Sequence, residues 1–236
     1  MIAVNEVSAS SYTAEVSIPV GNIILRGSLA VPPDATSIVL FAHGSGSSRF
    51  SPRNRFVAEE LNRAGLATLL FDLLTPEEET VDDSTAELRF NIELLAERLV
   101  AATDWLRGEP RLTNLKVGYF GASTGAAAAL VAAAKRPGIV RAVVSRGGRP
   151  DLAAGALTGV KAPVLLIVGG RDEVVIELNN QAAKQLPGEK ELVVVPGATH
   201  LLGEPGALEE VSRLAKEWFT GQLSAGPERG NLKGEF

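Results

Sequence analysis

Residues 116–135, KVGYFGASTGAAAALVAAAK, decide the fold of this chain. They consist of an apolar strand ending at Phe120, the pentapeptide Gly121-Ala122-Ser123-Thr124-Gly125 and an alanine-rich helix. A G-x-S-x-G motif between a strand and a helix predicts a sharp turn that lifts the serine hydroxyl above the edge of a sheet. Glycines two positions on either side remove Cβ atoms that would clash there. The alternative is an ordinary glycine-rich turn with an incidental serine, but the flanking strand and helix favour a nucleophile at Ser123.

Further strand-length segments lie on both sides of this motif. Two short alternating segments, around 14–20 and 23–31, predict an N-terminal hairpin. Continuous apolar runs, typical of parallel strands covered on both faces, lie at 37–42, 67–71, 116–120, 140–145, 164–168 and 191–195. Alternation of these runs with helices predicts an α/β fold, a mostly parallel doubly wound sheet with an antiparallel N-terminal hairpin.

Capping signals indicate where the helices begin and end. Ser51-Pro52 and Gly65 bound one helix. Ser84 and Glu87 have the spacing of a capping box and are expected to begin the helix that runs through Leu106. The acidic run 76–83 is expected to be a solvated loop, with a divalent-cation site as the disfavoured alternative.

Composition restricts the class of protein. The chain has 236 residues, a net charge of −5 and no cysteine. We therefore expect no nucleic-acid or membrane partner, no disulfide and no thiolate metal site. No apolar run reaches the ~20 residues of a membrane span, and the first residues lack a signal-peptide pattern. These features predict a cytoplasmic protein without metal or cofactor and leave its oligomeric state open.

The expected domain boundaries follow from the same reading. We expect a single domain over residues 1–223, because neither a repeat nor an interdomain linker is evident. Residues 224–236 are polar and rich in glycine and charge, so they are expected to form a loose tail whose last residues are partly vector-derived.

A serine nucleophile needs a base and an acid that orients the base. Only two histidines are present. His200 lies in a loop between the last strand and the last helix, where the base is expected, whereas His43 is expected to order the loop that follows its own strand. Asp172 follows the next-to-last strand and is the expected acid, with Asp151 as the competitor one strand earlier. The alternatives are a surface histidine at 200 and, at Asp172, a helix cap or an ion pair with Arg171.

The oxyanion that forms during acyl transfer also needs hydrogen-bond donors. Thr124 supplies a backbone N–H at the start of a helix, and Ser45 is the expected second donor, with Gly46 as the second choice. Arg146 and Arg149 follow a strand on the same side and could bind a substrate carboxylate. Structural ion pairs with neighbouring acids such as Asp151 are the favoured alternative for both arginines.

With serine, aspartate and histidine in this order, the sequence resembles the α/β-hydrolase superfamily and, within it, the dienelactone-hydrolase-like group. The resemblance covers residues 14–223 and rests on His43-Gly44-Ser45-Gly46, Gly121-Ala122-Ser123-Thr124-Gly125, Gly170-Arg171-Asp172 and Ala198-Thr199-His200. It implies a hydrolase with a catalytic triad and an oxyanion hole. Dienelactone hydrolases typically use a cysteine nucleophile, so Ser123 points instead to a serine carboxylesterase.

The families that this chain resembles usually carry their cap domain after the strand at 140–145. Here only residues 146–163 intervene, so we expect an open site that prefers small or short-chain esters. The leucine pairs 73–74 and 201–202 are expected to add a modest apolar groove.

Two other functions are compatible with parts of the sequence. Gly44-Ser45-Gly46-Ser47-Ser48-Arg49, followed by Asp72, approaches the motif of an NAD(P)-binding oxidoreductase, but Arg49 replaces the third glycine. An NAD(P)-binding oxidoreductase would also give no role to the arrangement of Ser123, Asp172 and His200. A catalytically silent binding domain of the same fold is the other alternative, and an intact triad disfavours it.

Overall fold

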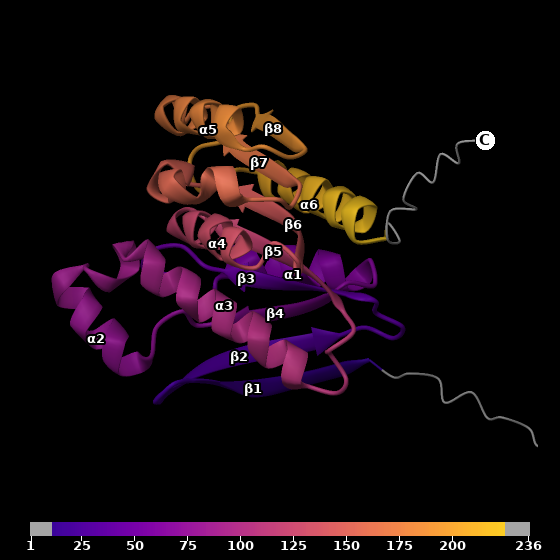
Figure 1. The fold of residues 1–236 in the computed structure, drawn as a ribbon. Coiled ribbons are helices and arrows are strands. Elements are labelled where there is room, and N and C mark those ends of the chain that lie inside the picture. Colours follow the sequence, from indigo (N-terminus) through magenta and orange to yellow (C-terminus); the bar gives the residue numbers. More distant parts are fainter. Residues whose placement is uncertain (1–10, 225–236) are drawn as a thin grey trace, which may run out of the picture.

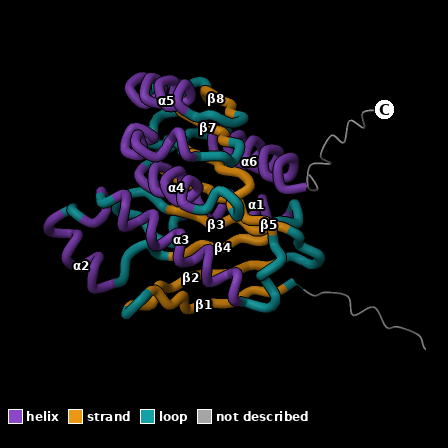
Figure 2. The backbone as a smooth tube through the Cα atoms, viewed as in Figure 1, coloured by secondary structure: helices purple, strands orange, loops and turns teal. Residues whose placement is uncertain are grey.

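The computed structural model describes residues 11–224 and shows one eight-stranded sheet with helices on both faces (Figures 1 and 2). The strands are β1 (Tyr12–Val20), β2 (Ile23–Val31), β3 (Ser37–Ala42), β4 (Ala67–Phe71), β5 (Lys116–Ala122), β6 (Val140–Arg146), β7 (Val164–Gly169) and β8 (Lys190–Val195). Their order across the sheet is β1-β2-β4-β3-β5-β6-β7-β8. β1 pairs antiparallel with β2 and β2 antiparallel with β4, and every later pairing is parallel. The predicted fold class is confirmed.

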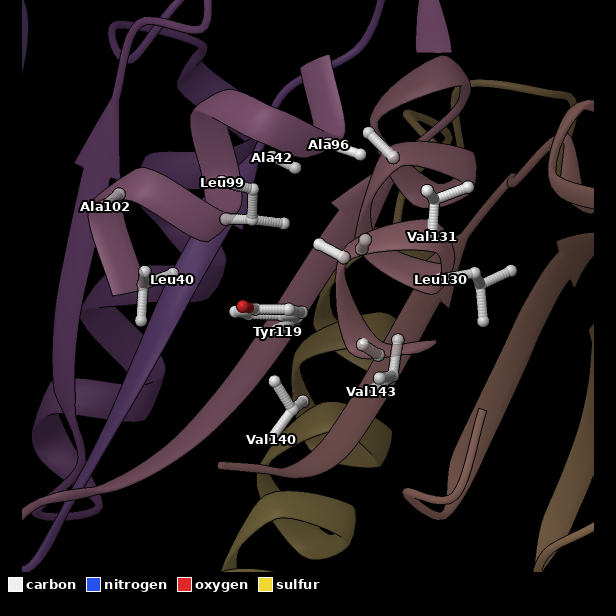
Figure 3. Packing of buried hydrophobic residues seen from close by; sticks show 14 of the residues in the cluster. Leu40, Ala42, Ala96, Leu99, Ala102, Tyr119, Leu130, Val131, Val140 and Val143 are labelled. Atoms are coloured by element: carbon white, nitrogen blue, oxygen red, sulfur yellow. The ribbon is translucent and has the colours of Figure 1, made fainter. Parts of the chain in front are cut away.

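The helices divide into two layers. α1 (Pro52–Arg63) and α6 (Ala207–Ser224) bury their apolar sides on one face of the sheet. The other face is covered by α3 (Ile92–Gly108), α4 (Thr124–Lys135), the 3-10 segment η2 (Pro150–Gly159) and α5 (Glu173–Gln185). In Figure 3, Tyr119 of β5 and Leu40 of β3 lie beneath Leu99 of α3. The hydroxyl groups of Tyr119 and Thr103 lie 2.6 Å apart, so the one polar group of this tyrosine is paired inside the core.

Helix α1 begins as its capping signals predict. Ser51 is its N-cap and accepts a hydrogen bond from the backbone N–H of Asn54, and Pro52 is its first residue. Gly65 follows the helix with φ +82°, a left-handed conformation that glycine adopts at little cost.

The segment between β4 and α3 differs from the expectation. The acidic run is a helix, α2 (Pro76–Thr85), and the 3-10 turn η1 (Leu88–Phe90) follows it. The capping box is formed by Thr75 and Glu78, whose side chains bond each other's backbone N–H groups. Proline in the first turn and three glutamates near the positive end of the helix dipole favour this start.

The capping box predicted at Ser84 and Glu87 was therefore wrong. α2 ends there because Ala86 takes a left-handed conformation with φ +55° and the buried carboxylate of Asp82 accepts the N–H groups of Leu88 and Arg89. α3 begins later, at Ile92, with Asn91 as its N-cap.

Only η2 lies between β6 and β7, so this connection holds no second domain, as expected. Among residues 11–224, no helix is both long and apolar enough to cross a membrane. The expected polar tail at 225–236 lies outside the described residues.

Candidate active site

Ser123 occupies a strained turn between β5 and α4. Its φ of +50° and ψ of −118° are unfavourable for a residue with a side chain, and strain of this kind gathers at functional sites. The two flanking positions must be glycine because a Cβ at either one would collide with neighbouring main-chain atoms. A Cβ on Gly121 would lie 2.4 Å from Cα of Ala126, and one on Gly125 would lie 2.2 Å from the carbonyl oxygen of Ala42. The motif therefore folds as the strand–turn–helix that its sequence predicts.

Three side chains from different loops form a chain of hydrogen bonds. Oγ of Ser123 lies 3.2 Å from Nε2 of His200, and Nδ1 of His200 lies 2.7 Å from Oδ2 of Asp172. The Asp172 contact places the Nδ1 proton on the histidine and leaves Nε2 able to accept the serine proton. Asp172 stands at the N-cap position of α5, but its side chain makes no capping hydrogen bond. The carboxylate is thus directed to His200 and not to the helix.

His43 directly follows β3, and its ring bonds other partners than these three side chains. It is buried; its Nε2 accepts the backbone N–H of Leu73 at 3.0 Å and its Nδ1 lies 3.1 Å from the carbonyl of Gly44. Both ring nitrogens are satisfied only by the neutral form with the proton on Nδ1. Burial lowers the pKa of His43, so the ring stays neutral. His43 thus ties its own loop to the loop that follows β4.

The pocket at Ser123 has a volume of about 470 Å³. Both residues expected to donate to the oxyanion, Ser45 and Thr124, line it together with Ser123, Asp172 and His200. The loop that carries Ser45 packs closely on the nucleophile, since a Cβ on Gly44 would lie 3.1 Å from Cβ of Ser123. Gly46, the second choice, is not among the residues that line this pocket.

The two arginines expected near the substrate occupy different environments. Arg149 lines the pocket. Its guanidinium forms a bidentate ion pair with Asp151 at 2.7 and 2.9 Å, which is the structural alternative expected from the sequence. Arg146 is buried, and its terminal nitrogen donates to the carbonyl of Leu201 at 2.8 Å. Arg146 does not line the pocket, so the geometry does not support substrate binding by this residue.

An apolar wall of the pocket was missed by the sequence analysis. Phe90 from η1 and Val174, Val175 and Leu178 from α5 line it. Phe90 and Val174 are 56% and 72% exposed, so they form the accessible rim. None of the leucines expected to form a groove lines this pocket: 73 and 74 line a neighbouring cavity, Leu202 is buried, and Leu201 is exposed outside the pocket lining. For the α5 part of this wall, the signal available in the sequence was the apolar pair Val174-Val175, which begins two residues after Asp172.

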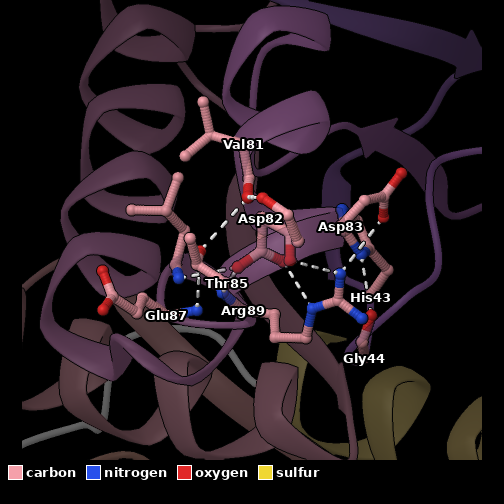
Figure 4. A network of polar contacts seen from close by, with 10 residues as sticks. His43, Gly44, Val81, Asp82, Asp83, Thr85, Glu87 and Arg89 are labelled. Atoms are coloured by element: carbon pink, nitrogen blue, oxygen red, sulfur yellow. Dashed lines mark hydrogen bonds and ion pairs between the residues drawn. The ribbon is translucent and has the colours of Figure 1, made fainter.

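The neighbouring cavity, about 280 Å³, lies under α2 and shares Ser45 and Thr124 with the Ser123 pocket. Figure 4 shows its polar network, in which Arg89 binds Asp82 and Asp83 close to His43 and Gly44. Burial and the nearby carboxylates of Asp72 and Asp83 raise the pKa of Glu79 in this wall. Over the described part of the chain, no cluster of three or more histidine, aspartate or glutamate side chains could hold a metal ion.

The loop considered for a dinucleotide has a different role. Asp72 accepts the backbone N–H of Arg49 at 2.8 Å through one oxygen and pairs with the Arg49 guanidinium through the other. Both oxygens of the carboxylate that would have bound a ribose are therefore occupied within the protein.

Comparison with known proteins identifies the family. The model of the dienelactone hydrolase family matches residues 25–217. The crystal structure of a dienelactone hydrolase from Anabaena variabilis is similar with a TM-score of 0.89 and 62% identity, over 91% of this chain and all of that one. Est1E from Butyrivibrio proteoclasticus is 20% identical with a TM-score of 0.73, over 89% of this chain and 99% of its own, a likeness that shows the fold.

A curated relative carries a different name. A protein of Mycobacterium tuberculosis named "Putative phosphoribosyl transferase" is 60% identical over 209 residues, which are 89% of this chain and 46% of that protein. The chain thus spans about half the length of this relative, and the name describes the longer protein.

Proposed function

Because the chain belongs to the dienelactone hydrolase family, we propose that it is a serine hydrolase that cleaves small or short-chain carboxylic esters through an acyl-enzyme intermediate. Membership of the family supports a hydrolase. The observation that carries the finer proposal is the hydrogen-bonded chain from Ser123 through His200 to Asp172 at the pocket. Such a chain converts a poorly nucleophilic hydroxyl into one that can attack a carbonyl carbon.

In the proposed reaction, Oγ of Ser123 attacks the ester carbonyl while its proton moves to Nε2 of His200. The imidazolium is stabilised by Asp172 at 2.7 Å. Backbone N–H groups of Ser45 and Thr124 hold the negative oxygen, in a pocket where fixed donors need no reorganisation. His200 then gives the proton to the leaving alcohol, and the acyl group remains on Ser123.

Hydrolysis of the acyl-enzyme repeats these steps with water as the nucleophile. His200 takes a proton from the water, the hydroxide oxygen bonds to the acyl carbon, and the bond to Oγ of Ser123 breaks as His200 returns the proton. The product acid leaves, and the starting state of the three side chains is restored.

The shape of the pocket supports a preference for short acyl chains. η2 is the only element between β6 and β7, and the apolar wall is confined to Phe90, Val174, Val175 and Leu178. A long acyl chain would therefore extend into water after its first few carbons. Each methylene that is buried contributes about 0.8 kcal/mol, close to a fourfold gain in kcat/KM.

A panel of p-nitrophenyl esters tests this preference. We expect kcat/KM to be highest between acetate and butyrate and to stay flat or fall towards palmitate. Phe90→Ala should reduce the preference for butyrate over acetate several-fold because it removes the rim of the apolar wall. Phe50→Ala is the matched control, since Phe50 is equally exposed but lines a separate groove. A steady rise to palmitate, with activation at a lipid interface, would instead indicate a lipase.

The remaining expectations stay predictions for this chain. They are a single domain over 1–223, a cytoplasmic location, a small-molecule ester as the partner and a reaction without cofactor. Arg149 stays a proposed contact for polar substrate groups because it faces the pocket beside Ser123.

A further inference from the structure

Arg146, the last residue of β6, is an arginine in an unusual environment. The residue is 6% exposed, the Nε of its side chain has no hydrogen-bond partner among the described residues, and the one partner of its guanidinium there is the carbonyl of Leu201. Burial and the nearby charge of Arg53 lower the pKa of Arg146 to about 10. A buried cation without a counter-charge opposes folding, and an apolar residue of similar volume would ordinarily be more stable there. The cost of this arginine calls for a role other than stability.

Arg146 links the nucleophile to the loop of the base. Its carbonyl accepts the backbone N–H of Ser123 at 3.2 Å, and its guanidinium holds the carbonyl of Leu201, the residue directly after His200, at 2.8 Å. One residue thereby holds Ser123 through its main chain and the His200 loop through its side chain. The distance between Oγ of Ser123 and Nε2 of His200 depends on both attachments.

The residues after Arg146 fit the same role. Gly147 adopts φ +52°, and a Cβ there would lie 2.6 Å from the carbonyl oxygen of His200, so the two loops touch. The carbonyl of Gly148 accepts from Asn179 at 3.0 Å, which ties the segment to α5, the helix that begins after Asp172. On its other side, the His200 loop is held by Glu204, which accepts from the backbone and the hydroxyl of Thr199. Glu204 therefore holds the residue before His200, and Arg146 holds the residue after it.

We propose that Arg146 is a positioning residue: it fixes the His200 loop so that the imidazole reaches Ser123 and Asp172 at the same time. Its effect on turnover rests on the proposed function, whereas its effect on the imidazole does not. Arg146→Met keeps the length and apolar volume of the side chain and removes the donor. Arg146→Lys keeps a cation that can reach a carbonyl oxygen.

Kinetics and thermal unfolding test the proposal together. For Arg146→Met we expect kcat to fall about 10- to 100-fold, since a misplacement near 1 Å costs that much, while KM changes less than about threefold. The melting temperature should stay the same or rise. Arg146→Lys should recover part of kcat. Arg136→Met, which removes a surface arginine paired with Asp104, is the control and should leave kcat unchanged.

The imidazole itself gives a readout that does not depend on activity. The chain has two histidines, so a ¹⁵N-histidine spectrum contains signals from His200 and His43 alone. The signals of His43 serve as an internal reference because this ring is buried and has hydrogen-bond partners of its own. We expect Arg146→Met to shift or broaden the His200 signals and to leave those of His43 in place. The proposal would be overturned if Arg146→Met left both the His200 signals and kcat unchanged. It would also be overturned if kcat fell together with the melting temperature and the signals of both histidines changed, because the loss would then come from general destabilisation. Retained turnover in Ser123→Ala would refute the proposed function alone, since the His200 signals would still decide the role of Arg146.

Discussion

Ser123→Ala should abolish ester hydrolysis, with kcat reduced ~10⁴- to 10⁶-fold. The substitution deletes one oxygen, the atom that lies 3.2 Å from Nε2 of His200 and that we propose as the attacking group. The glycines that permit the turn, Gly121 and Gly125, are untouched. The melting temperature is therefore expected to change by no more than a few degrees.

Initial rates with p-nitrophenyl butyrate, together with circular-dichroism melting, check this result. Ser45→Ala is a useful companion variant because we propose that Ser45 acts through its backbone N–H and not through its hydroxyl. It should retain most of the activity. More than a few per cent of wild-type turnover in Ser123→Ala would mean that another group attacks the ester.

Asp172→Asn should lower kcat by ~10⁴-fold while the fold is retained. The carboxylate accepts the Nδ1 proton of His200 at 2.7 Å. An amide can present its NH₂ group to Nδ1 instead, which would favour the tautomer with the proton on Nε2 and leave no acceptor for the serine proton. The side chain of Asp172 makes no capping hydrogen bond to α5, so little stability should be lost with it.

Asp151→Asn is the matched control for this variant. Asp151 was the competing candidate in the sequence, and its carboxylate is bound by Arg149. We expect the control to change kcat less than about tenfold. Equal losses in the two variants would contradict the assignment of Asp172 as the acid that orients His200.

Much of the fold could be predicted from local patterns because the inner strands β3 to β7 are buried almost throughout. A continuous apolar run such as the one at 164–168 is typical of a parallel strand that has a neighbour on each side and is covered on both faces. The contacts of Ser123, His200 and Asp172 were also foreseeable. Loops at the carboxyl ends of parallel strands meet at one edge of the sheet, and two histidines left little choice of base.

Between Thr75 and Phe90, the start of α2 has a signal in the sequence, whereas its end could not be predicted in this way. The pair Ser84 and Glu87 has the same spacing as the capping box of Thr75 and Glu78, and proline in the first turn favours the latter pair. Tertiary contacts then end the helix, because the carboxylate of Asp82 binds N–H groups six and seven residues later. Such contacts leave no periodic signal in the sequence.

The environments of Arg146 and Arg149 could not be predicted from the sequence either. Arg146 and Arg149 are three residues apart at the end of β6, yet Arg146 is buried against the His200 loop and Arg149 lines the pocket. Their sequence positions are alike because one is the last residue of β6 and the other follows it by three residues. The difference arises from the direction of each side chain at the strand end, which depends on how the loops pack.

Covalent labelling with a fluorophosphonate probe, followed by peptide mass spectrometry, tests the central claim most directly. The probe phosphonylates a serine only where a base activates it. We predict one adduct per chain, on the peptide that contains Ser123, and strongly slowed labelling in Asp172→Asn. No adduct on an enzyme that turns over esters, or an adduct on another serine that persists in Ser123→Ala, would contradict the assignment of Ser123 as the nucleophile.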